Sequence, residues 1–219
     1  NKDPKLSDKR VRRALAHLTD VSEIIDIVYE GGAQRIAGPI HPAKSYYNDD
    51  LAPVPFNVER AKTLLAEAGW EDTNGNGIVD KEIDGEQVEL SLELSHWAGR
   101  ETVQNMVLII QEDARQAGVD IQLAPKESNV IAEERARRDY EMAMGGYRIS
   151  PTLDDLKQIW HSESDTPGGS NQVGFNNEEA DQIMDDIQTE FDPERRRELY
   201  MRLQEIIYEE QPVIFLFVN

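Results

Sequence analysis

The chain has 219 residues, which suffices for one large domain or two small ones. Its 23 Lys and Arg against 43 Asp and Glu give a formal net charge of −20, which argues strongly against binding to a nucleic-acid backbone. It has no cysteine, which excludes disulfide bonds and thiol chemistry, and no apolar run of about 18 residues that could span a membrane. Asn1 begins in charged sequence without a signal peptide, as we would expect of an excised fragment.

The segment Ser7–Tyr29 predicts two helices in close succession. Apolar residues of the first helix recur at i, i+3, i+4 and i+7 and form one stripe: Val11, Ala14, Leu15 and Leu18. Ser7 is the predicted N-cap of this helix, and Asp20 with Glu23 forms a predicted capping box for the second. The other face of the first helix carries Lys9, Arg10, Arg12 and Arg13. One interpretation of this cluster is a phosphate site, and the other is a solvated face that pairs with the chain's own carboxylates.

A long connector, residues 30–56, follows the second helix and is rich in Gly and Pro. Connectors of this length are usually functional or packed across another surface, and we expect Tyr46 and Tyr47 to be packing residues. Asn57 is the predicted N-cap of the next helix. This helix is expected to stop at Gly69, with Trp70 folding back in a Schellman-type end.

The next segment, DTNGNGIVDKE, is similar to a calcium-binding loop. Oxygen-bearing side chains occupy positions 1, 3, 5 and 9 of the EF-hand pattern, namely Asp72, Asn74, Asn76 and Asp80. Position 12 of that pattern requires a bidentate Glu and is Ile83 here, with Glu82 one residue early. A calcium site and an Asn/Gly-rich turn that leads into a hairpin are therefore the two interpretations of this segment.

Alternating hydrophobicity predicts strands at Val88–Leu94, Val119–Leu123 and Tyr140–Gly146. A helix from about residue 100 to 117 separates the first two strands, and a short helix near residues 129–138 separates the next two. Strand, helix and strand in this order predict a β–α–β unit with a parallel sheet.

Ligands of open parallel sheets collect beyond the carboxyl ends of the strands. This rule selects residues 125–129 and two sets of candidate ligand-binding residues, Ser95, His96 and Trp97 after the first strand, and Tyr147, Arg148 and Ser150 after the third. Trp97 offers a flat apolar face, although it could instead cap the core. Tyr147 and Arg148 form the stronger pair, because a core strand has little reason to end in Arg.

The last third of the chain predicts three helices and a strand. A helix near Asp154–Trp160 precedes a soft loop, Ser162–Gly174, and two amphipathic helices, the second of which begins at Asp192 and Pro193. Val213–Val218 is a continuous apolar run, which predicts a strand buried on both faces or one that joins another domain. We expect this strand to lie in the same sheet as the other three.

Four segments in this order resemble landmarks of one known family. They are SDKRVRRAL with the following D-x-x-x-I-I helix, GPIHP at residues 38–42, NVERAKTLLAEAGW at residues 57–70, and DPERRRELYMRLQEIIYEEQPVIFLFV at residues 192–218. Together they resemble the second large lobe of the dipeptide/oligopeptide-binding proteins of ABC importers. The resemblance implies an α/β fold, one lobe of a class II periplasmic-binding-protein-like fold, with a mostly parallel sheet flanked by helices. Residues 1–219 would form a single domain.

The resemblance also implies a function. The chain would be the ligand-binding lobe of an extracytoplasmic protein, periplasmic or on the cell surface, that captures a peptide or a related small solute. Its partners would be a missing N-terminal lobe and an ABC transporter permease. Family members carry G-W-x-x-D after the third strand, and the aspartate meets the ligand's α-ammonium. This chain has GYRIS at residues 146–150, so Ser150 replaces the aspartate and an anionic or neutral ligand is favoured.

Two alternatives remain open from the sequence. One is an extracellular hydrolase domain, but no nucleophile with a suitable base is evident, and with 43 acidic residues no general acid/base pair can be singled out. The other is a structural calcium-binding module built on the Asp72 loop. We expect a binding protein that is not an enzyme and requires no cofactor.

Overall fold

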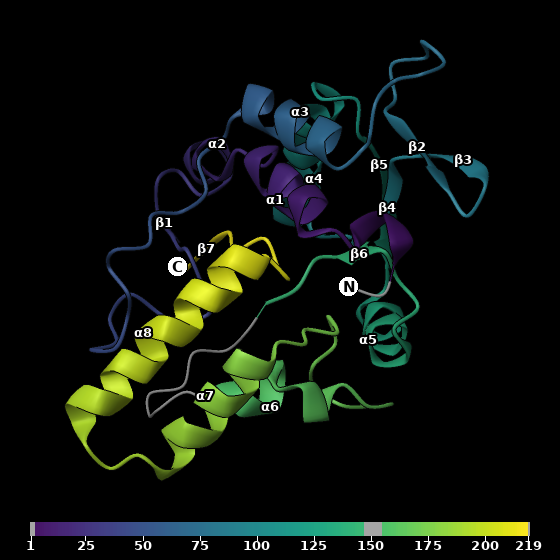
Figure 1. Ribbon diagram of the computed structural model, residues 1–219. Coiled ribbons are helices and arrows are strands. Elements are labelled where there is room, and N and C mark those ends of the chain that lie inside the picture. The colour runs from purple at the N-terminus through teal and green to yellow at the C-terminus, as the bar shows by residue number, and fades with distance from the viewer. Residues whose placement is uncertain (1–2, 147–154, 219) are drawn as a thin grey trace.

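A computed structural model describes residues 3–146 and 155–218 (Figure 1). Its largest sheet has three parallel strands in the order β5-β4-β6, formed by Asp120–Lys126, Ser91–Trp97 and Met142–Ala143. Two antiparallel pairs complete the strands: β2 (Asp80–Ile83) with β3 (Glu86–Glu89), and β1 (Gln34–Arg35) with β7 (Phe217–Val218). The predicted α/β fold with a parallel sheet is confirmed.

Eight α-helices and two short 3-10 helices are described. The α-helices are α1 (Lys9–His17), α2 (Val21–Val28), α3 (Val58–Glu67), α4 (Glu101–Arg115), α5 (Ser128–Arg137), α6 (Leu156–Trp160), α7 (Glu178–Thr189) and α8 (Pro193–Glu210). The 3-10 helices are η1 (Pro4–Leu6) and η2 (Ser162–Ser164). None of the described helices is both long and apolar enough to cross a bilayer.

The two faces of the parallel sheet are covered unequally. Leu92 and Leu94 of β4 point to one face, where they pack with Val107 of α4 in a large hydrophobic core. Residues of the other face, such as Glu93 and Ser95, are polar because successive strand side chains alternate. Among the described elements, α5 contacts this second face, where its Glu134 bonds Ser95 and Lys126.

The chain builds two hydrophobic cores. The first contains the sheet, α1, α3 and α4, and the second is formed by α6, α7 and α8 with two residues of the long connector, Ile40 and Tyr46. Figure 1 shows α7 and α8 side by side, below the part of the molecule that holds the sheet. Tyr46 stacks on Tyr200 of α8, with ring centroids 4.2 Å apart, so it is a packing residue as predicted.

The prediction that the last strand joins the main sheet is wrong. Only Phe217 and Val218 form a strand, and it pairs with β1 outside the three-stranded sheet. Residues of this run pack alternately into the two cores: Val213 and Phe215 into the second, and Ile214, Leu216 and Phe217 into the first. The run is therefore continuously apolar because it passes between two cores.

The predicted strand Val88–Leu94 is also corrected, because it is two strands. β3 ends at Glu89 and belongs to the hairpin with β2, whereas β4 begins at Ser91 in the parallel sheet. Leu90, between them, is fully buried, and its N–H donates to the Val79 carbonyl. The third strand is shorter than predicted, with only Met142 and Ala143 in the ladder.

The predicted N-caps at Asp20 and Asn57 form, but the predicted N-cap at Ser7 and the reciprocal bond of the capping box at Glu23 do not. Asp8, rather than Ser7, caps α1 by accepting the N–H of Arg10, while Ser7 donates its hydroxyl to the Pro4 carbonyl. Asn57 caps α3, and this helix ends in the predicted Schellman pattern. There the Gly69 and Trp70 N–H groups donate to the Ala66 and Leu65 carbonyls, both at 2.9 Å.

Asp113 completes the cap of α2 from another helix. Asp20 accepts the N–H groups of Ser22 and Glu23, but its own N–H donates to Oδ2 of Asp113 at 2.9 Å instead of to Glu23. Asp113 is only 5% exposed. Burial raises the pKa of its carboxyl group, although the bond from Asp20 partly opposes the shift.

Asp113→Asn is expected to stabilise the protein at neutral pH. The raised pKa means that the folded state disfavours the charged carboxylate of Asp113. The free energy of unfolding therefore falls as the pH rises from 3.8, the ordinary pKa of an aspartate, through the higher pKa that Asp113 has in the folded protein. Asparagine keeps an acceptor for the Asp20 N–H without this cost. Melting curves should show a higher Tm for the variant at pH 7 and no gain at pH 3. An equal gain at both values would contradict the titration of Asp113 as the cause.

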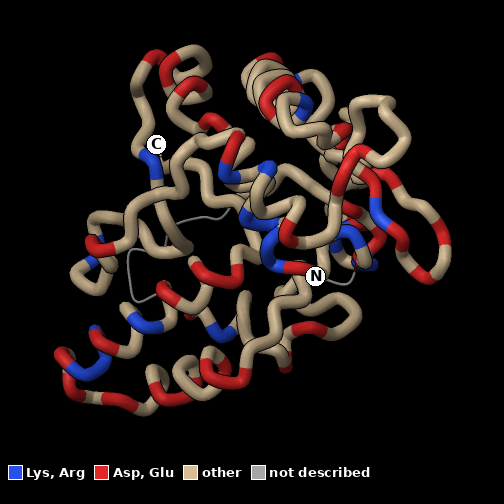
Figure 2. The backbone as a smooth tube through the Cα atoms, turned by 45° about the horizontal axis from the view of Figure 1, so that its top comes forward, with Lys and Arg blue, Asp and Glu red and all other residues tan. Residues whose placement is uncertain are grey.

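Charges of both signs are interspersed along the chain, with acidic residues in excess (Figure 2). The basic cluster on α1 pairs with the chain's own carboxylates: Lys9 with Glu210 at 3.1 Å, Arg10 with Asp8, and Arg12 with Glu210. The predicted pairing with the chain's own carboxylates is therefore confirmed for these three residues, but Arg12 is only 11% exposed and does not belong to a solvated face.

Candidate functional site

The carboxyl ends of the parallel strands meet at one edge of the sheet. Trp97 of β4 is level with Lys126 of β5, and Ser95 is level with Ala143 of β6. The tertiary structure therefore brings together the predicted residues 95–97 and the start of residues 125–129. Tyr147, Arg148 and Ser150 lie outside the described residues. They follow Gly146, which leaves the sheet at the same edge.

A polar network occupies the thinly covered face next to this edge. Ser95 is buried, and its hydroxyl donates to Oε2 of Glu134 at 3.2 Å. Lys126 bonds Oε1 of Glu134 at 2.7 Å and Oε1 of Glu93 at 2.6 Å. Partial burial works against the ammonium charge, yet the bonds to the two carboxylates outweigh it and raise the pKa of Lys126. Ser95 therefore braces α5 against the sheet.

His96 and Trp97 differ in their environment. His96 is only 2% exposed, and its Nδ1 has no hydrogen-bond partner within the described residues. Trp97 is half-buried and packs partly against the first core, and its contact with a ligand remains a prediction. The guanidinium group of Arg100 lies 5.0 Å from the centroid of its ring, in a cation–π arrangement. Sequence reasoning missed Arg100, which follows the turn at Gly99.

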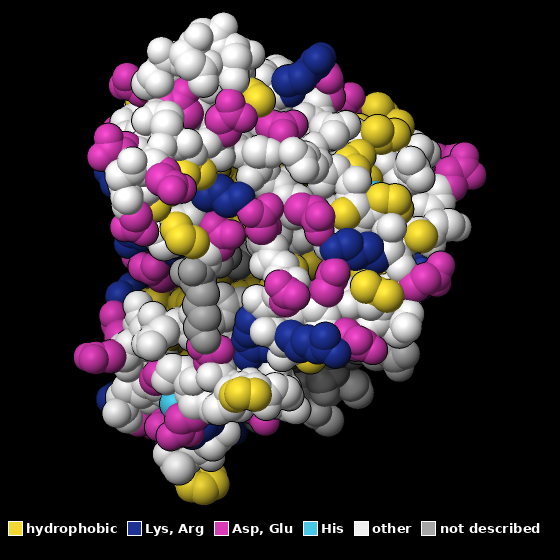
Figure 3. All heavy atoms as spheres, turned by 90° about the vertical axis from the view of Figure 1, so that its right-hand side faces the viewer, with side chains coloured by type: hydrophobic (Ala, Val, Ile, Leu, Met, Phe, Trp, Pro, Cys, Tyr) yellow, Lys and Arg dark blue, Asp and Glu magenta, His cyan; other side chains and the backbone are white. Residues whose placement is uncertain are grey.

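A polar cavity of about 450 Å³ lies beside the sheet, on the side of its exposed face. Its walls are Asp3, Glu93, Arg138, Asp139, Tyr140, Glu141, Gln172, Val173 and Gly174. The Tyr140 hydroxyl donates to the Gln172 carbonyl at 2.8 Å, and Arg138 pairs with Asp165 at 3.3 Å, which ties the loop after η2 to the sheet. On the face shown in Figure 3, acidic and basic side chains are interleaved and hydrophobic ones form only small groups.

The Asp72 loop is held by its own side chains. Asp72 accepts the N–H groups of Gly75, Asn76 and Gly77, which closes the turn. Asp80 accepts the Thr73 hydroxyl at 2.6 Å, and Gln87 also donates to it. Within residues 3–146 and 155–218, no three His, Asp, Glu or Cys side chains come together as a metal cluster. These contacts support the turn, and the calcium site remains a prediction.

Thermal melting tests the calcium prediction. If the loop binds calcium, the Tm should rise in millimolar calcium relative to chelator, because a ligand of the folded state alone stabilises it. Asp72→Ala should abolish that rise. Identical melting curves with and without calcium would contradict the calcium site and favour the interpretation as a turn. In that case Asp72→Ala should lower the Tm equally in both conditions, because it removes the bonds that close the turn.

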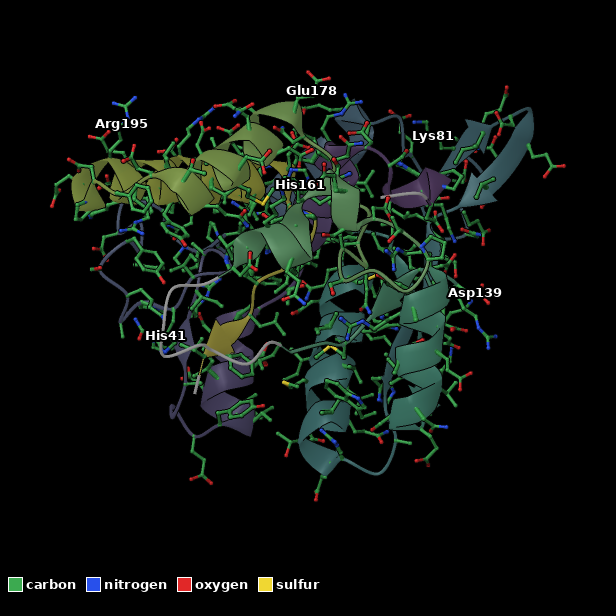
Figure 4. All side chains as sticks on the ribbon, turned by 90° about the horizontal axis from the view of Figure 1, so that it is seen from below. His41, Lys81, Asp139, His161, Glu178 and Arg195 are labelled. Carbon is green, nitrogen blue, oxygen red and sulfur yellow. The ribbon has the colours of Figure 1, made fainter. Side chains whose placement is uncertain are left out.

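The histidines do not converge. Figure 4 shows His41 and His161 far apart, on different elements. His161 is buried against α7, with Asp185 Oδ1 3.7 Å from Nε2 and Asp181 Oδ1 3.8 Å from Nδ1. Its Nδ1 accepts the N–H of Glu163 at 3.1 Å, and Lys157 already pairs with Asp185. The described surroundings of His161 are therefore those of a helix-packing residue.

Comparisons with known proteins place the chain in a family. The sequence profile of the bacterial extracellular solute-binding proteins, family 5 (Middle), matches residues 1–170. The oligopeptide-binding protein AppA of Bacillus subtilis is 31% identical over 99% of the chain and 39% of AppA, and heme-binding protein A of Haemophilus influenzae is 27% identical over 94% of the chain and 35% of that protein.

Solved structures agree with this placement. The structure of Bacillus subtilis AppA in complex with a nonapeptide matches all of the chain and 43% of AppA, with a TM-score of 0.91 at 30% identity. An oligopeptide-binding protein from Thermus thermophilus in complex with a pentapeptide matches all of the chain and 39% of that protein, with a TM-score of 0.90 at 26% identity. The chain thus spans about two fifths of the length of these relatives.

Proposed function

Because the chain belongs to the bacterial extracellular solute-binding proteins of family 5, we propose that it forms one ligand-binding lobe of a two-lobe protein. That protein captures a peptide or a related small solute outside the cytoplasm and delivers it to the permease of an ABC importer. The observation that carries this proposal is the match of the whole chain to part of a peptide-bound relative.

The lobe supplies one wall of the binding cleft. This wall is the carboxyl edge of the parallel sheet, where the ends of β4, β5 and β6 lie side by side. Tight binding requires burial of most of the ligand surface, so a second wall from the other lobe must close over it. We therefore expect the isolated chain to bind the solute much more weakly than the two-lobe protein.

Of the six candidate residues selected from the sequence, Trp97, Tyr147, Arg148 and Ser150 are proposed to contact the solute, whereas Ser95 and His96 are only 1% and 2% exposed and are proposed to support the site from behind. Trp97 supports this role because it is only half-buried, with Arg100 lying over its ring. The burial and bonding of Ser95 point to a supporting role, in which it holds α5 against the strand end. Ser150 stands where the family has an aspartate, so a free α-ammonium is not expected to be the main anchor of the ligand.

Ligand-dependent closure of the two-lobe protein tests the proposal. Mass spectrometry of the ligand that survives purification would identify the solute, and small-angle scattering should then show compaction when that solute is added. Arg148→Ala is expected to weaken binding about tenfold or more, since a buried charge-assisted bond contributes on the order of 1.5–3 kcal/mol. A protein that neither carries nor closes on any solute would overturn the proposed function.

Trp97→Ala separates the two roles of the ring. We expect weaker binding with a small loss of stability, because Arg100 and part of the first core already contact the ring. Titration and a melting curve measured on the same variant check this. A large fall in Tm without loss of affinity would make Trp97 a core residue. Turnover of substrate by the purified protein would instead favour the hydrolase alternative.

A further inference from the structure

Arg135 has no carboxylate partner among the described residues, although the chain has a net charge of −20. More than half of the described arginines form ion pairs with acidic residues: Arg10, Arg12, Arg60, Arg115, Arg137, Arg138, Arg195 and Arg202. The side chain of Arg135 is partly buried on α5 and forms no hydrogen bond or ion pair with any described residue. A guanidinium group that is partly desolvated and unpaired is costly, so its position calls for an explanation.

Gly145 provides the surface on which Arg135 lies. A Cβ atom at Gly145 would be 3.3 Å from Nη1 of Arg135 and 3.6 Å from Cζ, so the guanidinium group rests on the bare backbone. The main-chain N–H of the preceding residue, Met144, still donates to the Ser95 carbonyl at 2.8 Å. Arg135 is therefore placed at the point where the chain leaves β6 for the residues of the proposed cleft.

A second unpaired guanidinium group lies at the same level of the sheet. The parallel register aligns Ser95 with Ala143, and both Trp97 and Gly145 are two residues beyond this pair. Arg100 lies over the ring of Trp97, and Arg135 lies over Gly145. No carboxylate pairs with Arg100 among the described residues. Two cations without acidic partners thus flank the carboxyl edge, in a protein where acids outnumber bases by 43 to 23.

We propose that Arg135, seated on Gly145, binds a carboxylate of the solute and selects solutes that carry this group over their neutral analogues. This proposal rests on the proposed function and specifies, in addition, that the solute carries a negatively charged carboxylate. A planar guanidinium group matches a carboxylate with two parallel N–H donors, and partial burial strengthens that pairing. Glu134, the neighbouring acid on α5, bonds Ser95 and Lys126, and it forms no ion pair with Arg135 among the described contacts.

Matched peptide probes test the selectivity in the two-lobe protein. The probes are alanine pentapeptide with a free carboxyl terminus and the same peptide as its terminal amide, titrated by calorimetry. Arg135→Gln is expected to weaken binding of the free acid about tenfold or more and to leave the amide unchanged. The control is Arg137→Gln on the same helix, because Arg137 is exposed and paired with Glu133. Equal losses for both peptides, or no loss for the free acid, would overturn the proposal.

Gly145→Ala tests whether the position of the Arg135 guanidinium group over Gly145 matters, without removing the charge of Arg135. The new methyl group would meet Nη1 at 3.3 Å and displace it, so binding of the free acid should weaken while the amide is unaffected. A melting curve of this variant should remain close to that of the native protein. If Gly145→Ala binds the free acid as well as the native protein does, the placement of Arg135 on Gly145 is irrelevant to the ligand and the proposal fails.

An inorganic anion gives a readout that does not depend on the second lobe. Sodium sulfate, titrated into the 219-residue chain at constant ionic strength, should shift the Gly145 amide and Arg135 Nε–H resonances saturably in ¹⁵N spectra. Arg135→Gln should abolish the Gly145 shift. No response at either resonance would overturn the anion site even if the two-lobe protein closes on a solute. A response without any solute-dependent closure would support the anion site and refute only the proposed function.

Discussion

Replacing Asn171 with alanine is expected to lower the free energy of unfolding by about 3 kcal/mol or more. Asn171 is fully buried, and its amide nitrogen donates to the carbonyls of Trp160, His161 and Phe175 at 3.3, 3.1 and 2.8 Å. Its Oδ1 accepts the N–H of Phe175 at 3.1 Å. Alanine would remove these bonds from the Trp160 and Phe175 carbonyls and from the Phe175 N–H, and each buried group left without a partner costs about 1–3 kcal/mol. The His161 carbonyl would still accept the N–H of Ser164 at 3.0 Å.

The effect should extend beyond the loop itself. Asn171 holds Phe175 against Trp160, whose ring is 1% exposed and meets Phe175 edge-on with centroids 5.9 Å apart. A loss of 3 kcal/mol corresponds to a fall in Tm of roughly 6–12 °C for a chain of this size. Asn176→Ala is the matched control, because Asn176 is exposed in the same loop. Equal Tm values for Asn171→Ala and Asn176→Ala would contradict the assignment of this network.

Arg12→Met is expected to destabilise the protein by about 3 kcal/mol through a different set of bonds. The Arg12 side chain is 11% exposed, and its guanidinium group donates to four backbone carbonyls. Two belong to the end of α8, Glu210 at 2.7 Å and Gln211 at 3.2 Å, and two to the segment before α1, Leu6 at 3.0 Å and Ser7 at 2.8 Å. Arg12 thereby joins the last helix to the first and neutralises the negative end of α8.

Salt dependence separates this role from an ordinary surface ion pair. Because Arg12 bonds mainly to partly buried carbonyls, the destabilisation by Arg12→Met should persist in 1 M salt, where exposed pairs are screened. Arg13→Met, one residue along, is the control and should change the Tm little. Denaturant titrations of both variants at low and high salt measure the difference. If the loss of stability in Arg12→Met disappears at high salt, the ion pair with Glu210, rather than the bonds to the carbonyls, accounts for the contribution of Arg12.

Both predictions concern how the two hydrophobic cores are held together, which bears on the proposed cleft. The residues of the proposed site come from the sheet, whereas the loop fixed by Asn171 supplies Gln172 and Gly174 to the polar cavity beside the sheet. Arg138 and Tyr140, which follow α5, bond that loop. We therefore expect Asn171→Ala to increase hydrogen exchange around residues 138–141 as well as within the loop.

The sequence alone determined the features that depend on neighbouring residues. The caps at Asp20 and Asn57, the end of α3 at Gly69, and the succession of β4, α4 and β5 were all predictable, because capping and periodicity are local. The family was also predictable from four short segments in order. The predicted soft loop, by contrast, contains the most fully bonded side chain of the second core, since nothing near Asn171 in the sequence indicates which carbonyls it will meet.

Only the tertiary structure decided how distant segments share their surfaces. The apolar run Val213–Val218 predicts burial, yet whether it enters the main sheet depends on where the two cores lie, and it passes between them to pair with β1. Arg135 likewise lies on a helix rich in charge, where nothing distinguishes it from Arg137. The difference arises because α5 turns Arg135 toward the bare backbone of Gly145 and leaves Arg137 in solvent beside Glu133. Long-range packing, which pattern and propensity do not encode, selects one guanidinium group for the strand end and the other for the surface.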